Sequence, residues 1–370
     1  MVFSSSVFLL LFLPAVLVAY FVIPNRAYRN IILLLASLLF YAWGEPVYMV
    51  LMIVSIVVNW LFAILVESRE AKGAFLFADL AANLAILGFF KYQGFVAQNI
   101  NVLFGTAIPD LDLPLPIGIS FYTLQAISYV VDVYRGEVPA QRNPLYLGMY
   151  IAMFPQLVAG PIVRYSTIRD QILNRKENLA DFCAGVRLFI VGLAKKVLLA
   201  NAVAILAAEM LEGGGSQIGA AGAWAGLIAY TFQIYFDFSG YSDMAIGLGK
   251  MFGFQYLRNF NYPYISKSIT EFWRRWHISL SSFFRDYVYI PLGGNRVGKP
   301  RWIFNLSVVW VLTGVWHGAA WNYVLWGVFY LVVLLLEKFV WGSALAKLPS
   351  ILQHLYTIIV FMFCVATVLD

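Results

Sequence analysis

The run YMVLMIVSIVVNWLFAILV, residues Tyr48–Val66, decides the class of fold, because it is predominantly apolar and carries no charged side chain. A helix needs roughly 20 apolar residues to cross the hydrocarbon core of a bilayer. Four further helix-like runs reach or approach that length. They are Val7–Ile23, Ala74–Phe90, Trp302–Val315 and Trp321–Trp341. These runs predict a chain that crosses a membrane several times.

Shorter or polar-interrupted apolar runs fit spans packed inside a bundle, or re-entrant segments. They are Ile31–Trp43, Ile117–Val133, Leu145–Val163, Phe182–Leu211, Ile218–Phe238 and Ile351–Leu369. Together the runs predict an all-α, polytopic transmembrane helical bundle with about ten membrane segments. The chain shows no repeat of fixed period, and the glycine-rich loop Glu212–Ser216 is too short to separate domains. Residues 1–370 are therefore predicted to form a single membrane domain.

Composition excludes a soluble fold. Of the 370 residues, 62% are hydrophobic and only 12% are charged, whereas roughly a quarter are charged in a soluble domain. Val7–Ile23 is predicted to be a retained first span, because no basic residue precedes it and no small-x-small cleavage site follows it. Cys183 and Cys364 lie far apart in apolar runs, which predicts small core residues and no disulfide.

The placement of charge predicts orientation. The stretch Lys250–Arg301 holds nine Lys and Arg residues against two acids, so it is predicted to face the cytoplasm. Arg26 and Arg29 place the first loop on the same side and the N-terminus outside. The net charge of +6 is then explained by topology and by attraction to lipid headgroups. Nucleic-acid binding is a poor interpretation, because the basic residues border membrane segments.

Two familiar chemical motifs fail. Gly293–Lys299 matches the GxxxxGK part of a phosphate-binding loop, but Pro300 stands where a magnesium-binding Ser or Thr is needed and no buried strand precedes it. This stretch is predicted to be a glycine-rich basic turn at the membrane surface. The three histidines have no His or acid at ligand spacing, so no metal site is expected.

The segment Ser268–Ser281 is aromatic and basic at once. It is too charged to cross lipid but has enough Trp and Phe to lie in the interface, so one interpretation is an amphipathic anchor. His277 favours a chemical role. It follows two arginines that would depress its pKa, leaving a neutral imidazole able to accept or pass a proton.

His317 is the sharper candidate, because apolar runs flank it on both sides. Counting ~1.5 Å per residue from Arg301, it lies about 24 Å along a helix, at or beyond the middle of a core about 30 Å thick. An ionisable group at such depth is a functional candidate by default. The small residues Gly314, Gly318, Ala319 and Ala320 are expected to leave room for a chain or substrate beside it.

Three blocks carry a family resemblance. They are EFWRRWHISL (Glu271–Leu280), RDYVYIPLGGNR (Arg285–Arg296) and GVWHG (Gly314–Gly318). Supporting blocks are Met1–Ser5, Leu115–Tyr122, Gly160–Pro161 and Tyr235–Gly247. The chain closely resembles the membrane-bound O-acyltransferase family, in particular its bacterial branch that O-acetylates exopolysaccharides such as alginate.

The resemblance implies a helical bundle with a central tunnel, embedded in the bacterial inner membrane. It implies acetyl-CoA as the cytoplasmic donor substrate, no permanently bound cofactor, and an exported polysaccharide as acceptor. It also implies a periplasmic SGNH-type acetyltransferase partner, with acetyl transfer either direct or relayed through that partner. His317 aligns with the family's invariant catalytic histidine and His277 with the second motif histidine. Relatives are expected to continue with C-terminal membrane segments beyond Asp370.

Acetyl transfer from a thioester to a hydroxyl needs a base near the attacking oxygen and a donor for the tetrahedral oxyanion. His317 is the predicted base, and Trp316 or Asn322 is predicted to orient it or to donate. Guanidinium groups bind phosphate in a bidentate manner, which suits coenzyme A. The predicted donor-site and tunnel residues are Arg274, Arg275, Arg285, Trp273 and Trp276.

Two other classes of function compete with this one. A proton-coupled transporter or flippase of a polysaccharide export system would use the buried histidine with Asp237 or Asp243 as a relay. It predicts inverted halves with matching broken helices, which the sequence does not show. A scaffolding subunit of an export complex would need no buried histidine.

Overall fold

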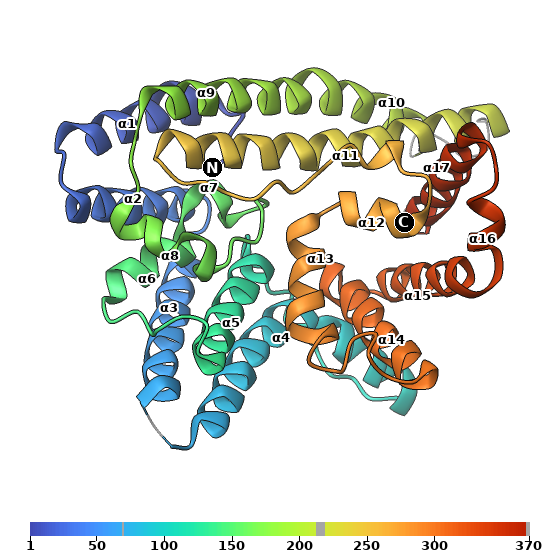
Figure 1. The fold of residues 1–370 in the computed structure, drawn as a ribbon, viewed down its shortest axis with the longest axis horizontal. Coiled ribbons are helices and arrows are strands. Elements are labelled where there is room, and N and C mark those ends of the chain that lie inside the picture. The colour runs from blue at the N-terminus through green and yellow to red at the C-terminus, as the bar shows by residue number, and fades with distance from the viewer. Residues whose placement is uncertain (69, 212–218, 368–370) are drawn as a thin grey trace. The chain divides into compact units, whose positions relative to one another are not determined.

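The computed structural model describes residues 1–68, 70–211 and 219–367 (Figure 1). The described residues form α-helices with short π- and 3-10 segments and contain no strand, which confirms the predicted all-α class. The predicted loop Glu212–Ser216 lies outside the described residues. The chain divides into two compact units, Met1–Leu193 with Asp243–Leu257, and Ala194–Ser242 with Arg258–Asp370. The expectation of a single membrane domain stays a prediction.

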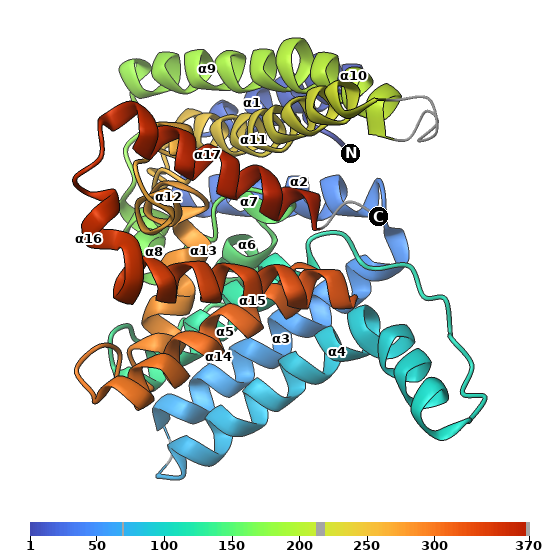
Figure 2. The same cartoon turned by 90° about the vertical axis from the view of Figure 1, so that its right-hand side faces the viewer.

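The first unit is built on three helices that pack side by side, α3, α4 and α5 (Figure 2). Its helices are α1 (Leu13–Val22), α2 (Arg26–Ala42), α3 (Pro46–Ser68), α4 (Lys72–Phe104), α5 (Ile119–Arg135), α6 (Pro144–Ala152), α7 (Phe154–Leu157), α8 (Tyr165–Asn174) and α9 (Leu179–Ala194). Buried phenylalanine rings of Phe8, Phe40 and Phe154 pack at its core, with centroids 5.6–6.2 Å apart. The predicted run Leu145–Val163 is two helices, because Met153 leaves the helical region (ψ 111°) and Pro155 starts the next turn.

Arg26 and Arg29 belong to a partly buried ionic cluster in the first unit. Both pair with the carboxylate of Glu177, at 2.5 and 2.9 Å. Burial alone would raise the pKa of Glu177, but hydrogen bonds from Arg26 and Tyr20 outweigh it and lower that pKa to about 2. The two arginines therefore stabilise the fold whatever they contribute to orientation, which stays a prediction.

The second unit carries the histidine motifs. Its helices are α10 (Asn201–Leu211), α11 (Ala220–Met251, whose end belongs to the first unit), α12 (Ile269–Arg275), α13 (Ile278–Phe284), α14 (Lys299–His317), α15 (Trp321–Leu336), α16 (Gly342–Leu345) and α17 (Ser350–Ala366). Helices α14 and α15 form the most extensive helix pair (Figure 2). Between α12, α14 and α15 the Trp273 ring packs edge to face against Trp310 and Tyr330, with centroids 5.0 and 4.8 Å apart, and the latter two rings lie tilted at 5.4 Å.

Among the residues that the structure describes, four helices are long and apolar enough to cross a membrane. They span Pro46–Ser68, Lys72–Phe104, Leu179–Leu211 and Trp321–Leu345. Helices over Phe8–Val22 and Ser350–Ala366 are apolar but shorter. The count of about ten segments and the central tunnel stay predictions. Cys364 is buried as expected, but Cys183 is exposed on α9, so its prediction as a core residue is wrong.

Candidate functional site

His277 occupies a break between two short helices. Ser268 caps α12 by accepting a hydrogen bond of 3.0 Å from the backbone N–H of Glu271. The helix ends at Arg275, and His277 follows with a left-handed backbone (φ 44°) before α13 begins. A residue with a β-carbon pays for this conformation in strain, and such residues concentrate at functional sites. The break directs the imidazole into the interior, where the residue is only 2% exposed.

Aromatic rings surround the His277 imidazole. The Phe238 ring lies edge-on at 4.8 Å between centroids, and the Trp316 ring lies at 6.0 Å. Burial, and then the nearby His317, lower the pKa of His277 to about 3. The imidazole is therefore neutral at physiological pH, as expected, but the neighbouring arginines are not the reason. Arg275 instead pairs with Glu271 at 2.8 Å.

His317 is the last residue of α14, and its side chain is exposed. Its ring lies 5.0 Å from that of Trp316 and 4.7 Å from that of Trp326 on α15. Trp316 therefore stands between the two histidines, with an indole ring in contact range of both. The structure thus places the two predicted catalytic residues, His277 and His317, beside the same indole ring, that of the predicted site residue Trp316.

Two of the four small residues beside His317, Gly314 and Gly318, do not leave open space. A β-carbon on Gly314 would lie 2.5 Å from the carbonyl oxygen of Tyr323, and one on Gly318 would lie 2.1 Å from the Tyr323 ring. Helix α15 fills the space at these two positions. The expectation of room is therefore wrong for the glycines, which serve close helix packing.

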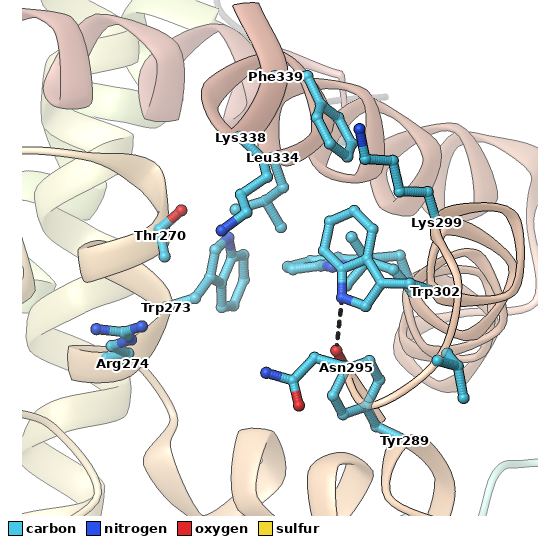
Figure 3. A pocket seen from close by; sticks show the side chains of 13 residues that line it. Thr270, Trp273, Arg274, Tyr289, Asn295, Lys299, Trp302, Leu334, Lys338 and Phe339 are labelled. Carbon is cyan, nitrogen blue, oxygen red and sulfur yellow. Dashed lines mark hydrogen bonds between the residues drawn. The ribbon is translucent and has the colours of Figure 1, made fainter. Parts of the chain in front are cut away.

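A cavity of about 210 Å³ adjoins His277 and includes Trp273, Arg274 and Arg285 in its lining. A larger cavity of about 630 Å³ shares Trp273 and Arg274 with it (Figure 3). The two cavities have five lining residues in common: Trp273, Arg274, Tyr289, Leu306 and Trp310.

The larger cavity is cationic and aromatic. Its lining includes Arg274, Lys299 and Lys338 and contains no acid. Trp302 forms part of the wall, and its indole N–H donates a hydrogen bond of 2.8 Å to the hydroxyl of Tyr289 (Figure 3). Lys338 extends its ammonium group towards Trp273 (Figure 3). This combination suits an anionic molecule with flat or apolar parts.

The remaining predicted residues have structural contacts. Arg275 pairs with Glu271 and donates to the carbonyl of Asn261 (3.1 Å), and it lines neither cavity. Trp276 is buried against Phe272, with ring centroids 5.5 Å apart. Arg285 lines the smaller cavity while its guanidinium pairs with Asp286 at 2.6 Å.

Asn322 is the second residue of α15, and its side-chain oxygen accepts a hydrogen bond of 2.9 Å from the Tyr323 N–H. Asp237, a residue of the transporter hypothesis, forms an ion pair with Lys196 at 2.7 Å. The predicted basic turn at Gly293–Lys299 is indeed a turn, in which Gly293 and Gly294 take positive φ angles. Within the described ranges, no three His, Cys, Asp or Glu side chains gather to hold a metal.

Several site residues carry no motif of their own. Asn259 contacts His277, Glu337 binds the start of α12, and Lys299 and Lys338 line the larger cavity. The sequence shows Lys299 as one of nine cations in Lys250–Arg301 and as the last residue of the GxxxxGK match, and neither feature indicates that it lines a cavity. The pattern Ser268-x-x-Glu271 is a capping box, which marks where α12 begins. Nothing comparable marks Asn259 or Glu337.

The chain belongs to the membrane-bound O-acyltransferase family, a family of acyltransferase enzymes whose family model matches residues 141–369. It is 46% identical over 91% of its length to a probable alginate O-acetylase AlgI of Pseudomonas syringae pv. tomato, and 43% identical over 99% to that of Pseudomonas aeruginosa. A peptidoglycan O-acetyltransferase of Helicobacter pylori is 36% identical over 96% of the chain. The chain spans 66%, 71% and 75% of the lengths of these three relatives, respectively.

Proposed function

We propose that the protein transfers an acetyl group from cytoplasmic acetyl-CoA, across the membrane, to an exported polysaccharide. The acceptor is a hydroxyl of the polymer itself, or a periplasmic SGNH-type acetyltransferase that passes the group on. The observation that carries this proposal is the arrangement of His277, Trp316 and His317. The ring centroid of Trp316 lies 6.0 Å from that of His277 and 5.0 Å from that of His317. Family membership, and relatives named for O-acetylation of alginate and of peptidoglycan, support the reaction class.

The proposed chemistry uses His317 as general base. Its neutral imidazole takes the proton of the attacking hydroxyl as the oxygen adds to the thioester carbonyl. An N–H donor stabilises the resulting oxyanion, and the Trp316 indole, beside both imidazoles, has the required group. The tetrahedral intermediate then collapses, the C–S bond breaks, and the imidazolium returns its proton to the leaving thiolate. The products are an O-acetyl ester and the free thiol of coenzyme A.

The larger cavity is the proposed site of the donor's phosphates. Arg274, Lys299 and Lys338 supply positive charge without a competing carboxylate in the lining. The indoles of Trp273 and Trp302 offer apolar faces for the uncharged parts of the donor. The two cavities share five lining residues, so the phosphate site of this proposal lies next to the cavity beside His277.

The test is transfer of radiolabelled acetyl groups by purified protein in lipid vesicles. Acetyl-CoA is supplied on the side of the basic segment, with alginate oligosaccharides or peptidoglycan fragments on the other side. Label is expected in an ester that mild alkali releases, or in free acetate where no acceptor is present. Intact acetyl-CoA under all conditions, in protein shown to be folded, would exclude the proposal. Proton-coupled movement of the polymer without any acetyl transfer would favour a transporter instead.

A further inference from the structure

Asn259 is a fully buried residue whose side chain faces His277. Its Oδ1 lies 3.3 Å from the His277 Nδ1 and accepts hydrogen bonds from the backbone N–H (3.1 Å) and hydroxyl (2.9 Å) of Ser279. Its backbone carbonyl accepts a further bond of 2.9 Å from the N–H of Ile278. Asn259 thus holds both residues that follow His277 and one nitrogen of the imidazole itself.

The backbone N–H of Ser279 establishes which way the Asn259 amide points. A backbone nitrogen only donates, so the amide atom facing it is the carbonyl oxygen and not the NH₂ group. The amide therefore presents an acceptor to His277. This orientation follows from a main-chain donor and needs no assumption about a hydroxyl or a ring.

The same oxygen then decides where the imidazole proton lies. A bare Nδ1 would direct its lone pair at an oxygen lone pair, whereas a protonated Nδ1 donates to it. The Ser279 hydroxyl does not supply a hydrogen bond that would stabilise an unprotonated Nδ1, because it lies closer to the Asn259 oxygen (2.9 Å) than to the His277 Nδ1 (3.4 Å). We propose that Asn259 holds His277 as the neutral Nδ1–H tautomer, which makes Nε2 a proton acceptor.

This assignment gives His277 a definite part in the proposed reaction, on which this step rests. With its proton on Nδ1, the imidazole cannot donate from Nε2, so it is not the donor for the oxyanion. It instead accepts a hydrogen bond at Nε2 from a second hydroxyl of the acceptor, which orients the attacking hydroxyl while the proton of the latter goes to His317. Should Nε2 take up the proton, the Asn259 oxygen stabilises the resulting cation through the Nδ1–H bond. Asn259 is thus a positioning residue, because it acts through His277.

The experiment is nitrogen NMR of protein labelled with ¹⁵N-histidine in lipid bilayers at pH 7. The His277 signal is assigned by its loss in His277→Gln. The wild-type spectrum is expected to show a protonated Nδ1 and a bare Nε2. Asn259→Leu is expected to give a tautomer mixture, whereas Asn259→Asp, which keeps the acceptor, retains Nδ1–H. Ser279→Ala is the matched control, because it removes one bond to Asn259 and leaves the acceptor in place.

A proton on Nε2 in the wild-type protein would overturn the proposal, as would an unchanged Nδ1–H in folded Asn259→Leu. The wild-type spectrum decides alone if that variant does not fold. The spectrum does not depend on catalysis, so it separates this inference from the proposed function. In an active enzyme, Asn259→Leu is expected to lower kcat about 10²-fold with little change in KM for acetyl-CoA, and Asn259→Asp to restore much of it.

Discussion

The hydroxyl of Thr270 donates a hydrogen bond of 2.7 Å to the carboxylate of Glu337, which lies 67 residues later in the chain. The same carboxylate accepts from the backbone N–H groups of Ile269 (2.6 Å) and Thr270 (2.9 Å), the first two residues of α12. Glu337 directly follows α15 and is buried. A single side chain therefore ties the start of the helix that precedes His277 to the end of α15.

Replacing Glu337 tests this tie. Glu337→Ala leaves two helix N-terminal N–H groups and a hydroxyl without their acceptor, and is expected to lower stability by about 1–3 kcal/mol. Glu337→Gln retains one carbonyl oxygen and is expected to lose less. Thermal unfolding in detergent measures both. Equal loss in the two variants would show that charge alone, and not the hydrogen bonds, holds α12 in place.

His317→Ala is expected to reduce acetyl transfer about 10²–10⁴-fold, because it removes the proposed general base. His354→Ala is the matched control. That histidine contacts Ser350 and the carbonyl of Ser266, and it lines neither cavity. Initial rates at saturating acetyl-CoA, in samples with equal unfolding temperature, provide the comparison. Activity above a few per cent of wild type in His317→Ala would remove this residue from the role of base.

The cations of the larger cavity are expected to affect donor affinity and not the chemical step. Arg274→Lys loses the bidentate fork and Lys338→Met loses a charge, so each is expected to raise KM for acetyl-CoA about two- to fivefold. That range reflects exposed ionic contacts of ~0.5–1 kcal/mol. Arg275→Lys serves as control, since Arg275 pairs with Glu271 outside both cavities. If KM for acetyl-CoA rises more in Arg275→Lys than in Arg274→Lys and Lys338→Met, the donor binds outside the larger cavity.

The orientation of the basic segment can be tested with a single cysteine. Arg296 is exposed in the glycine-rich turn, so Arg296→Cys offers a reachable thiol once Cys183 and Cys364 are changed to Ser. A membrane-impermeant maleimide is expected to label it in inside-out vesicles and not in intact cells. Labelling from the periplasmic side would reverse the predicted topology.

The depressed pKa of His277 predicts a dependence of stability on pH. The folded protein keeps the ring neutral down to about pH 3, whereas the unfolded chain protonates it below its ordinary value of 6.5. The unfolded state therefore binds more protons between these values, and stability falls as pH decreases from 6.5 towards 3, by up to ~1.4 kcal/mol per unit. His277→Gln is expected to lose less stability than wild type between pH 7 and pH 5. Parallel melting temperatures for the two proteins would contradict this.

The sequence predicts the all-helical class correctly, for a physical reason. Apolar runs such as Tyr48–Val66 can be recognised from their composition alone, and the motifs around His277 and His317 consist of residues that are neighbours in the chain. Contacts between distant residues leave no such trace. Glu337 appears in the sequence as an ordinary acid at the end of an apolar run, and only the fold shows that it caps α12.

The same limit explains the errors. The sequence shows that Gly314 and Gly318 have no side chains, but it does not show that Tyr323 occupies the space beside them. Arg274 and Arg275 are close to His277 in sequence, yet the guanidinium of Arg275 forms an ion pair with Glu271. Sequence neighbours of a residue are therefore a poor guide to its electrostatic surroundings where the backbone reverses, as it does at the left-handed His277.

Helices α14 and α15 meet through main chain. A β-carbon on Gly314 would lie 2.5 Å from the carbonyl oxygen of Tyr323, and one on Gly327 would lie 2.4 Å from that of Trp310. No layer of side chains separates the helices there, so no rotamer change can let one slide along the other. The position of His317 at the end of α14 is consequently fixed by main-chain packing against α15, which leaves less freedom than contacts between flexible side chains.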